Sequence, residues 1–201
     1  MMIKKIIFVF AIALSLQLIS GCVDCNCGPV KDIYFTKKGL SLKNLDGSLP
    51  EPKVTKDSVI GSAKYGIQMQ FATEQLALNY HKVNWGLMST AMACSCEEDN
   101  VIGKEDILAV AIFSNNDFDA SHPKNTDLSL YFKAKLNDAH IPIDDYLKTL
   151  KDLKHSAIIA FYQWIFLQQA PTASKNHKFR VKINLSDGRV LEAETTEVQL
   201  R

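Results

Sequence analysis

The sequence has no excess of charge of either sign. Among its 201 residues, 23 Lys and Arg stand against 22 Asp and Glu, which gives a formal net charge of +1. Proteins that bind nucleic acid normally carry a basic excess or a basic stripe, and this sequence shows neither. It also has no polybasic block of the kind that binds anionic lipid headgroups. The composition therefore argues against a nucleic-acid partner.

Long hydrophobic runs and short catalytic motifs are also missing. No apolar run reaches the length of about 20 residues that a membrane-spanning helix needs. The five histidines show no HExxH spacing, no serine lies in a Gly-x-Ser-x-Gly turn, and no glycine-rich phosphate loop occurs. We therefore expect a protein that is not an enzyme and that has no cofactor.

Residues 1–21 have the form of an export leader. Lys4 and Lys5 precede an apolar stretch that continues to Ile19, with the size and flanks of a secretory signal. The stretch ends in Ile-Ser-Gly before Cys22, which resembles the bacterial lipobox. That resemblance implies cleavage before Cys22, followed by acylation of its sulfur and of the new amino group. The alternative is an ordinary signal peptide followed by a chance cysteine.

Acylation would make residues 22–201 a single lipid-anchored domain. Two or more acyl chains give stable membrane anchoring, whereas one chain gives only marginal binding. We therefore expect the membrane to be a partner through the N-terminal lipid. The expected location is the cell envelope at the outer membrane, on either its periplasmic or its cell-surface face.

Cysteine is scarce, and its spacing is distinctive. Lipidation of Cys22 leaves two Cys-x-Cys pairs, formed by Cys25 with Cys27 and by Cys94 with Cys96. Residues two apart in a strand lie about 7 Å from each other, which is beyond easy bridging. Because an exported chain meets an oxidising compartment, we predict disulfides between the pairs, in either of the two pairings. The rival interpretation is a thiol redox protein or a thiolate site for Zn(II) or Cu(I).

Alternating apolar residues and turn signals predict a mainly β fold, an immunoglobulin-like antiparallel β-sandwich with one or two short helices. Helical spacing predicts a helix at 143–153 and one helical turn at 128–132. The predicted strands are 30–36, 39–45, 65–72, 88–96, 107–114, 157–169, 179–185 and 189–198, the last two joined by a turn at 186–188.

Two groups of side chains could bind a ligand. Asp117, Asp119 and His122 put two carboxylates and an imidazole into one polar loop that could hold Ca(II), but their spacing matches no calcium-loop pattern. Asp and Asn in loops more often close turns, so these three are weak metal candidates and we predict no metal site. Four aromatic residues could instead form a surface for sugar or peptide, although bulky aromatics more often fill a core. They are Tyr80, Trp85, Tyr162 and Trp164.

Three stretches resemble a family of uncharacterised lipoproteins from Bacteroidota-type bacteria. They are residues 38–42 (KGLSL), 93–96 (ACSC) and 106–132, which includes DILAVAIFSNNDFD. The resemblance implies a lipid-anchored, mostly β domain of unknown function with no established catalytic residues. We therefore expect a non-catalytic envelope lipoprotein that binds a partner protein or glycan, or serves assembly.

Overall fold

The computed structural model describes residues 29–76, 99–152 and 162–201. By its internal contacts the chain divides into two units. One unit, Met1–Lys31 with Asn79–Asp99, contains few described residues, and there the Lys31 N–H donates to the Asp99 carboxylate at 3.0 Å. The other unit, Asp32–Leu78 with Asn100–Arg201, carries the fold. Within the described ranges, no helix is long and apolar enough to cross a membrane.

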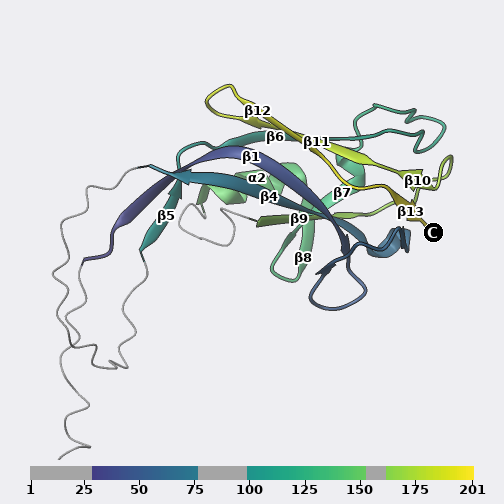
Figure 1. Ribbon diagram of the computed structural model, residues 1–201, viewed down its shortest axis with the longest axis horizontal. Helices are drawn as coiled ribbons and strands as arrows, with labels where there is room; N and C mark the ends of the chain where they lie inside the picture. Colours follow the sequence, from purple (N-terminus) through teal and green to yellow (C-terminus); the bar gives the residue numbers. More distant parts are fainter. Residues whose placement is uncertain (1–28, 77–98, 153–161) are drawn as a thin grey trace, which may run out of the picture. The chain divides into compact units, whose positions relative to one another are not determined.

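The largest sheet of the second unit has seven strands. Six follow the spatial order β2-β1-β4-β9-β7-β8, and β5 pairs in parallel with the first residues of β1 (Figure 1). The pairings along the order are antiparallel. The strands are β1 (Asp32–Asp46), β2 (Lys53–Val54), β4 (Tyr65–Gln75), β5 (Asn100–Gly103), β7 (Phe132–Leu136), β8 (Ala139–Pro142) and β9 (Tyr162–Leu167).

Two three-stranded sheets complete the unit. One has the antiparallel order β12-β11-β6, and the other has the order β10-β13-β3, with β3 parallel to β13. Their strands are β3 (Val59–Ile60), β6 (Ile107–Ser114), β10 (Asn176–His177), β11 (Phe179–Leu185), β12 (Val190–Glu194) and β13 (Val198–Leu200). The helical elements are η1 (Ser62–Lys64), η2 (Ser129–Tyr131) and α2 (Ile143–Asp152).

The core lies between the largest sheet and the β12-β11-β6 sheet. Alternate residues of β4 and β11 point into it, because successive side chains of a strand face opposite sides. The Tyr65 and Phe179 rings stack across the layers with their centroids 5.3 Å apart. Phe132 meets Phe179 edge-on at 5.5 Å. Each such fully buried side chain contributes about 1.5–3 kcal/mol to stability through its burial.

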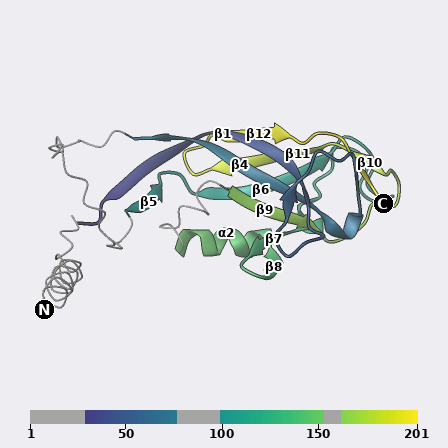
Figure 2. The ribbon, with the colours of Figure 1, turned by 60° about the horizontal axis from the view of Figure 1, so that its bottom comes forward.

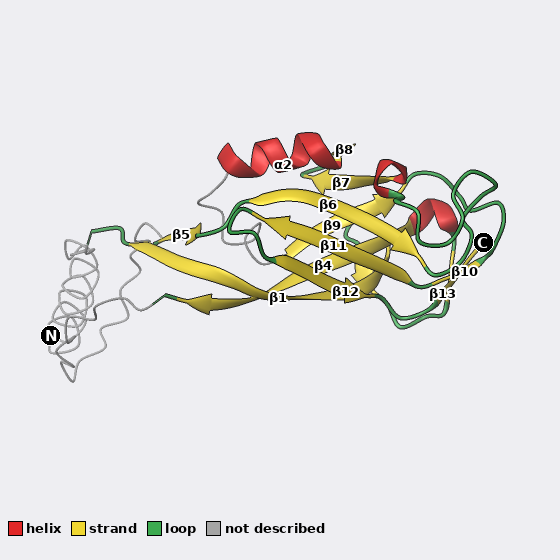
Figure 3. Cartoon of the chain, turned by 90° about the horizontal axis from the view of Figure 1, so that it is seen from above, coloured by secondary structure: helices red, strands yellow, loops and turns green. Residues whose placement is uncertain are grey.

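Helix α2 closes one side of the two layers. It packs against β6, β7 and β8, and it lies to one side of the strands (Figures 2 and 3). Its sequence places Ile143, Tyr146 and Leu147 on one face at helical spacing, and all three are buried. The acidic side chains of Asp144 and Asp145 occupy the first turn, where they complement the helix dipole.

The mainly β class, the sandwich and the helix are confirmed by this structure. The predicted strands at 65–72, 107–114 and 179–185 are present as β4, β6 and β11, and the turn at 186–188 joins β11 to β12. The stretch 157–169 contains β9. The predicted strand at 88–96 lies outside the described residues.

Three local predictions were wrong in detail, and one hairpin was missed. Stretches 30–36 and 39–45 form the single strand β1, with a register shift between Lys37 and Gly39. Stretch 189–198 divides, because β12 ends at Glu194 and Val198 begins β13 in another sheet. The turn at 128–132 is shorter than predicted and leads directly into β7. The hairpin of β7 and β8 was not predicted.

Candidate functional site

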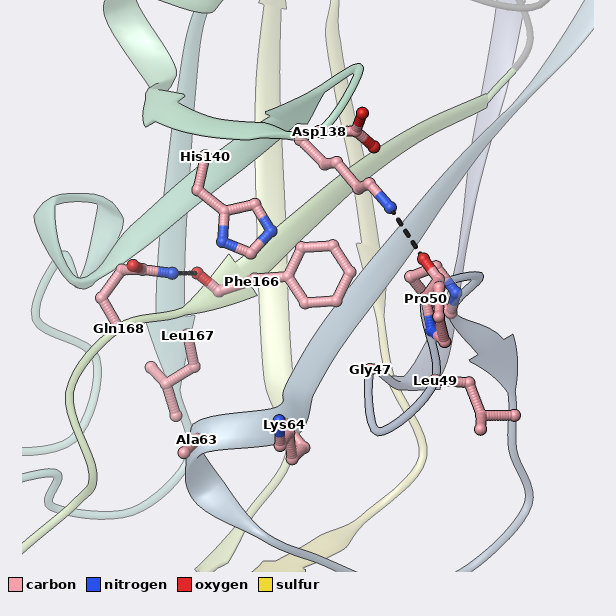
Figure 4. Close-up of a pocket in the computed structure, with 12 residues that line it drawn as sticks. Gly47, Leu49, Pro50, Ala63, Lys64, Asp138, His140, Phe166, Leu167 and Gln168 are labelled. Atoms are coloured by element: carbon pink, nitrogen blue, oxygen red, sulfur yellow. Dashed lines mark hydrogen bonds between the residues drawn. The ribbon is translucent and has the colours of Figure 1, made fainter.

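A pocket of about 410 Å³ opens beside the outward face of the largest sheet (Figure 4). Four separate parts of the chain build it: the loop after β1, η1, the β7–β8 hairpin and the end of β9. Its volume falls within the range of small-molecule sites. The residues that line it are Gly47, Leu49, Pro50, Pro52, Ala63, Lys64, Lys135, Asp138, His140, Phe166, Leu167 and Gln168.

The Phe166 ring is held between two glycines and an imidazole. A Cβ at Gly66, its cross-strand neighbour, would lie 2.7 Å from the ring, and one at Gly47 would lie 3.0 Å from it. The imidazole of His140 stacks against the same ring, with centroids 4.9 Å apart and planes 17° apart. Only residues without a side chain allow this close approach. The two glycines and His140 therefore fix the aromatic part of the pocket.

The pocket lining contains Lys64 and Lys135 against a single carboxylate, that of Asp138, so positive charge is in excess. The Lys135 ammonium donates to the Pro50 carbonyl oxygen at 3.2 Å and lies 5.7 Å from the centroid of the Trp164 ring. The side chain of Lys64 makes no hydrogen bond or salt bridge within the described part of the chain, and it is exposed. Burial lowers the pKa of His140, and the charges of Lys135 and Lys133 lower it further. His140 is therefore a neutral ring near neutral pH.

The rest of the rim offers hydrogen-bond acceptors. Gln168 donates its Nε2–H to the Phe166 carbonyl oxygen at 3.0 Å, which directs its amide along the edge of the pocket (Figure 4). Asp138 is exposed in the turn between β7 and β8, next to Asn137 with its positive φ of 53°. Asparagine tolerates this left-handed conformation better than most residues. The tight turn thus carries the Asp138 carboxylate to the pocket.

The pocket combines donors, acceptors and an apolar wall, which suits binding of a small polar ligand. Among the described residues that line it, no two ionisable side chains are hydrogen-bonded or ion-paired to each other.

The structure does not describe the cysteines of the sequence prediction. Cys22, Cys25, Cys27, Cys94 and Cys96 all lie outside the described residues. Lipidation of Cys22 and the disulfides between the pairs remain predictions. Tyr80 and Trp85 also lie outside, and Tyr162 begins β9. Trp164 is half-buried on the same sheet face as Lys135, so one predicted aromatic residue adjoins the pocket.

The structure brings together two of the three weak metal candidates. His122 Nδ1 lies 2.8 Å from the Asp119 carboxylate, and the Tyr131 hydroxyl donates to the same carboxylate at 3.2 Å. The hydrogen bond from the His122 ring contributes most to keeping the pKa of Asp119 below its usual value. Hydrogen bonds from backbone N–H groups and from Tyr131 lower this pKa further. Asp117 has another partner, the Lys124 N–H at 2.8 Å.

These carboxylates close turns, as the loop composition indicated. Asp119 accepts the N–H groups of Ser121 and His122 at 2.8 and 2.9 Å. Within the described ranges, no group of three His, Cys, Asp or Glu side chains is arranged to hold a metal ion.

Sequence reasoning did not single out the residues of the pocket. One signal could have found it. Gly66 interrupts the regular alternation of β4, and an isolated glycine in a strand marks a close approach of another group. That group is the ring of Phe166, which is the centre of the site.

Comparison with known proteins gives one family. A family model described as Domain of unknown function (DUF5034) matches residues 37–196, which is well over half of the chain and includes every residue of the pocket. No curated protein and no solved structure matches the chain. The predicted resemblance to an uncharacterised family is thus confirmed in general terms, while the bacterial group and the lipid anchor remain predictions.

Proposed function

The chain belongs to the family described as Domain of unknown function (DUF5034), and from that premise we propose that it is a non-catalytic ligand-binding module of the cell envelope. Acyl chains on Cys22 hold it at the membrane. The pocket beside Phe166 is its ligand site. The ligand is a glycan or an exposed part of a partner protein.

The way in which separate chain segments are held together around Phe166 supports this proposal. Four stretches that are distant in sequence converge on one ring, and each is fixed by its own contact. The Gly47 N–H donates to the Lys64 carbonyl oxygen at 2.8 Å, which ties the loop after β1 to η1. Lys135 ties the β7–β8 hairpin to the same loop through Pro50. A preformed concave site with a few placed polar groups is the usual form of a binding pocket.

The anchor is supported by the sequence alone. The positive n-region, the apolar stretch, the small Gly21 and Cys22 agree with one another as a lipoprotein leader. The matched family region begins at residue 37, downstream of that leader.

A blocked pocket tests the binding role. Ala63 is exposed and lines the pocket, so the large ring of Ala63→Trp would occupy the ligand space with little effect on the core. Ala120 is an exposed alanine of the 115–126 loop, and Ala120→Trp is the matched control. On an array of glycans and envelope proteins, wild type and Ala120→Trp should bind the same targets, and Ala63→Trp should lose them. Equal binding by all three chains would show that the pocket is not the ligand site.

Cell fractionation tests the anchor. The wild-type chain should stay with washed membranes, whereas Cys22→Ala should be released into the soluble fraction because it lacks the acyl chains. Equally tight association of Cys22→Ala with membranes would contradict lipid anchoring.

A further inference from the structure

We propose that the pocket beside Phe166 takes an acidic saccharide, a sugar ring that carries a carboxylate. This inference rests on the proposed binding role and names the class of ligand. Three features of the described residues lead to it: an electropositive rim, unused acceptors beside it, and a flat ring with an apolar wall.

The charge of the rim requires a negative group on the ligand. Lys64 and Lys135 both line the pocket, and neither forms a salt bridge within the described part of the chain, although the charge of Lys64 helps to lower the pKa of the nearby Asp46 carboxyl. The hydrogen-bond partner of Lys135 is a neutral carbonyl oxygen, that of Pro50. Lys133 adds positive charge close enough to affect His140. A ligand carboxylate would give these ammonium groups charge-assisted hydrogen bonds, which are stronger than neutral ones.

The acceptors require hydroxyl groups on the same ligand. Asp138 lines the pocket with no hydrogen-bond or ion-pair partner in the described ranges, although its carboxylate is a strong acceptor. Gln168 uses its Nε2–H on the Phe166 carbonyl, which leaves its Oε1 able to accept. A simple anion such as phosphate gives Asp138 no compensating contact. Sugar hydroxyls donate to Asp138 and Gln168 while a carboxylate on the ring meets the lysines.

The remaining surface suits a ring. His140 stacks on Phe166, lines the pocket and is itself exposed, so part of its ring is accessible to a ligand. The loop residues Leu49, Pro50 and Pro52 also line the pocket and supply apolar surface. A sugar has apolar C–H faces as well as hydroxyl edges, and it can contact both kinds of surface at once.

Nuclear magnetic resonance on the full chain in detergent micelles tests this class. Three probes separate the contributions: a disaccharide that contains glucuronic acid, the same disaccharide with its carboxyl reduced to an alcohol, and inorganic phosphate. The acidic disaccharide should shift the signals of His140 and Gln168 and should raise the pKa of His140, because a nearby negative charge favours the imidazolium form. The reduced disaccharide should leave the pKa unchanged and bind at least about tenfold more weakly.

Charge variants test the role of the lysines. Lys64→Ala removes an ammonium group that makes no other side-chain bond, and it should weaken binding of the acidic disaccharide by about tenfold. Lys64→Arg should restore binding. Lys43→Ala removes the same charge from an exposed position of β1 outside the pocket and should bind like wild type. Lys135→Gln keeps a donor for Pro50 and should also weaken binding.

The outcomes separate this inference from the proposed function. If both disaccharides bind equally and Lys64→Ala has no effect, the acidic class is wrong while the pocket remains a binding site. If phosphate alone shifts His140, the site binds simple anions and the saccharide is wrong. If no probe shifts a pocket signal, the saccharide class is wrong, and the array with Ala63→Trp then decides whether the pocket binds any ligand.

Discussion

Glu105 and Arg189 form a salt bridge between chain segments 84 positions apart, with 2.9 Å between Arg189 Nη2 and Glu105 Oε1. The Glu105 side chain is only 3% exposed. It also accepts hydrogen bonds from the Thr36 hydroxyl and from the Lys37 N–H, the latter at 3.0 Å. Burial alone raises the pKa of Glu105, but these hydrogen bonds and the charges of Arg189 and Lys37 outweigh it and leave the pKa below its usual value.

The same cluster secures the irregular part of β1. Arg189 Nη1 donates to the Lys37 carbonyl oxygen at 2.6 Å, and Lys37 Nζ donates to the Glu105 carbonyl oxygen at 2.9 Å. Because Lys37 sits at the register shift of β1, its backbone groups are directed to the cluster as well as to the neighbouring strand. The bonds join β1, the segment between β5 and β6, and the turn between β11 and β12.

Removal of the Glu105 carboxylate should destabilise the fold. Glu105→Ala removes the acceptor that Thr36, the Lys37 N–H and Arg189 Nη2 share, although Arg189 keeps its bond to the Lys37 carbonyl oxygen, and we expect a loss of about 3 kcal/mol in the free energy of unfolding. Glu105→Gln keeps one acceptor and should lose less. The matched control is Glu192→Ala, whose carboxylate pairs on the surface with Arg180 and Lys182 and should cost less than about 1 kcal/mol.

Urea unfolding followed by circular dichroism measures all three variants. A loss for Glu105→Ala no greater than that for Glu192→Ala would show that the cluster contributes little to stability.

A methyl group at Gly66 should disturb the pocket and the fold together. The new Cβ of Gly66→Ala would lie 2.7 and 2.8 Å from two atoms of the Phe166 ring and 2.9 Å from the Ile165 carbonyl oxygen, so the ring has to move. We expect a loss of about 2 kcal/mol from this overpacking. The displaced ring should also change the ring-current shift of His140, which stacks on it.

Gly61→Ala is the control for this change. Gly61 has ordinary extended angles, φ −63° and ψ 128°, and a Cβ there meets nothing within 4 Å. Its stability and its His140 signal should match wild type or show a slight gain in stability. An unchanged His140 signal in Gly66→Ala would mean that Phe166 is not held by the glycine.

The strands that were predicted correctly from the sequence are those with one buried and one exposed face. Period-2 alternation is clear in β4 and β11, because each has apolar residues on the core side and polar residues on the other. The break predicted within β1 was wrong. Two consecutive lysines are typical of a loop, but here Lys37 is buried and its ammonium group is bonded to Glu105. Such a long-range partner leaves no local pattern.

The site was harder to predict than the fold. Lys64 comes from η1, whereas Lys135, Asp138 and His140 come from the β7–β8 hairpin, and each alone is an ordinary surface residue. In the β7–β8 hairpin, β7 alternates Phe132, Ala134 and Leu136 with two lysines, but it is only five residues long and follows directly on η2, and β8 is mostly exposed and lacks such alternation. Only tertiary packing around Phe166 brings them together.

The predicted disulfides can be tested on the chain as exported. Links between the Cys25–Cys27 and Cys94–Cys96 pairs should remove two hydrogens per link from the mass of the non-reduced protein. Alkylation should label none of these four cysteines before reduction and all four after it. Four free thiols, or a metal ion retained in native mass spectrometry, would favour the rival thiol or metal function.

His177 should make the fold sensitive to mild acid. Its ring is fully buried: Nδ1 lies 2.8 Å from the Ser114 hydroxyl, and Nε2 lies 2.9 Å from the Ser174 carbonyl oxygen. With Nε2–H donating to Ser174 and the Ser114 hydroxyl donating to Nδ1, both contacts are satisfied by a neutral ring. Burial lowers the pKa of His177 below its usual value of 6.5, although the Ser174 contact opposes this.

The sign of the effect follows from the direction of the shift. Well above pH 6.5 the His177 ring is neutral in both the folded and the unfolded chain, so it adds no pH dependence to the free energy of unfolding. Below pH 6.5 the unfolded chain takes up the proton first, so stability should fall, at up to about 1.4 kcal/mol per pH unit, until the folded pKa is reached. Urea unfolding at pH 7.5, 6.5 and 5.5 measures this slope.

Two comparisons assign the slope to His177. His140 also has a lowered pKa, but its ring is exposed, so His140→Gln should keep most of the slope. His177→Gln should be less stable at pH 7.5, because it loses a buried ring between Phe118 and Phe179, and should show a flatter slope. If that variant does not fold, the ring signal of wild-type His177 decides the question. A His177 signal that titrates at or above pH 6.5 in the folded chain would contradict the prediction, because the folded chain would then take up the proton at least as readily as the unfolded chain and acid would not destabilise the fold through this ring.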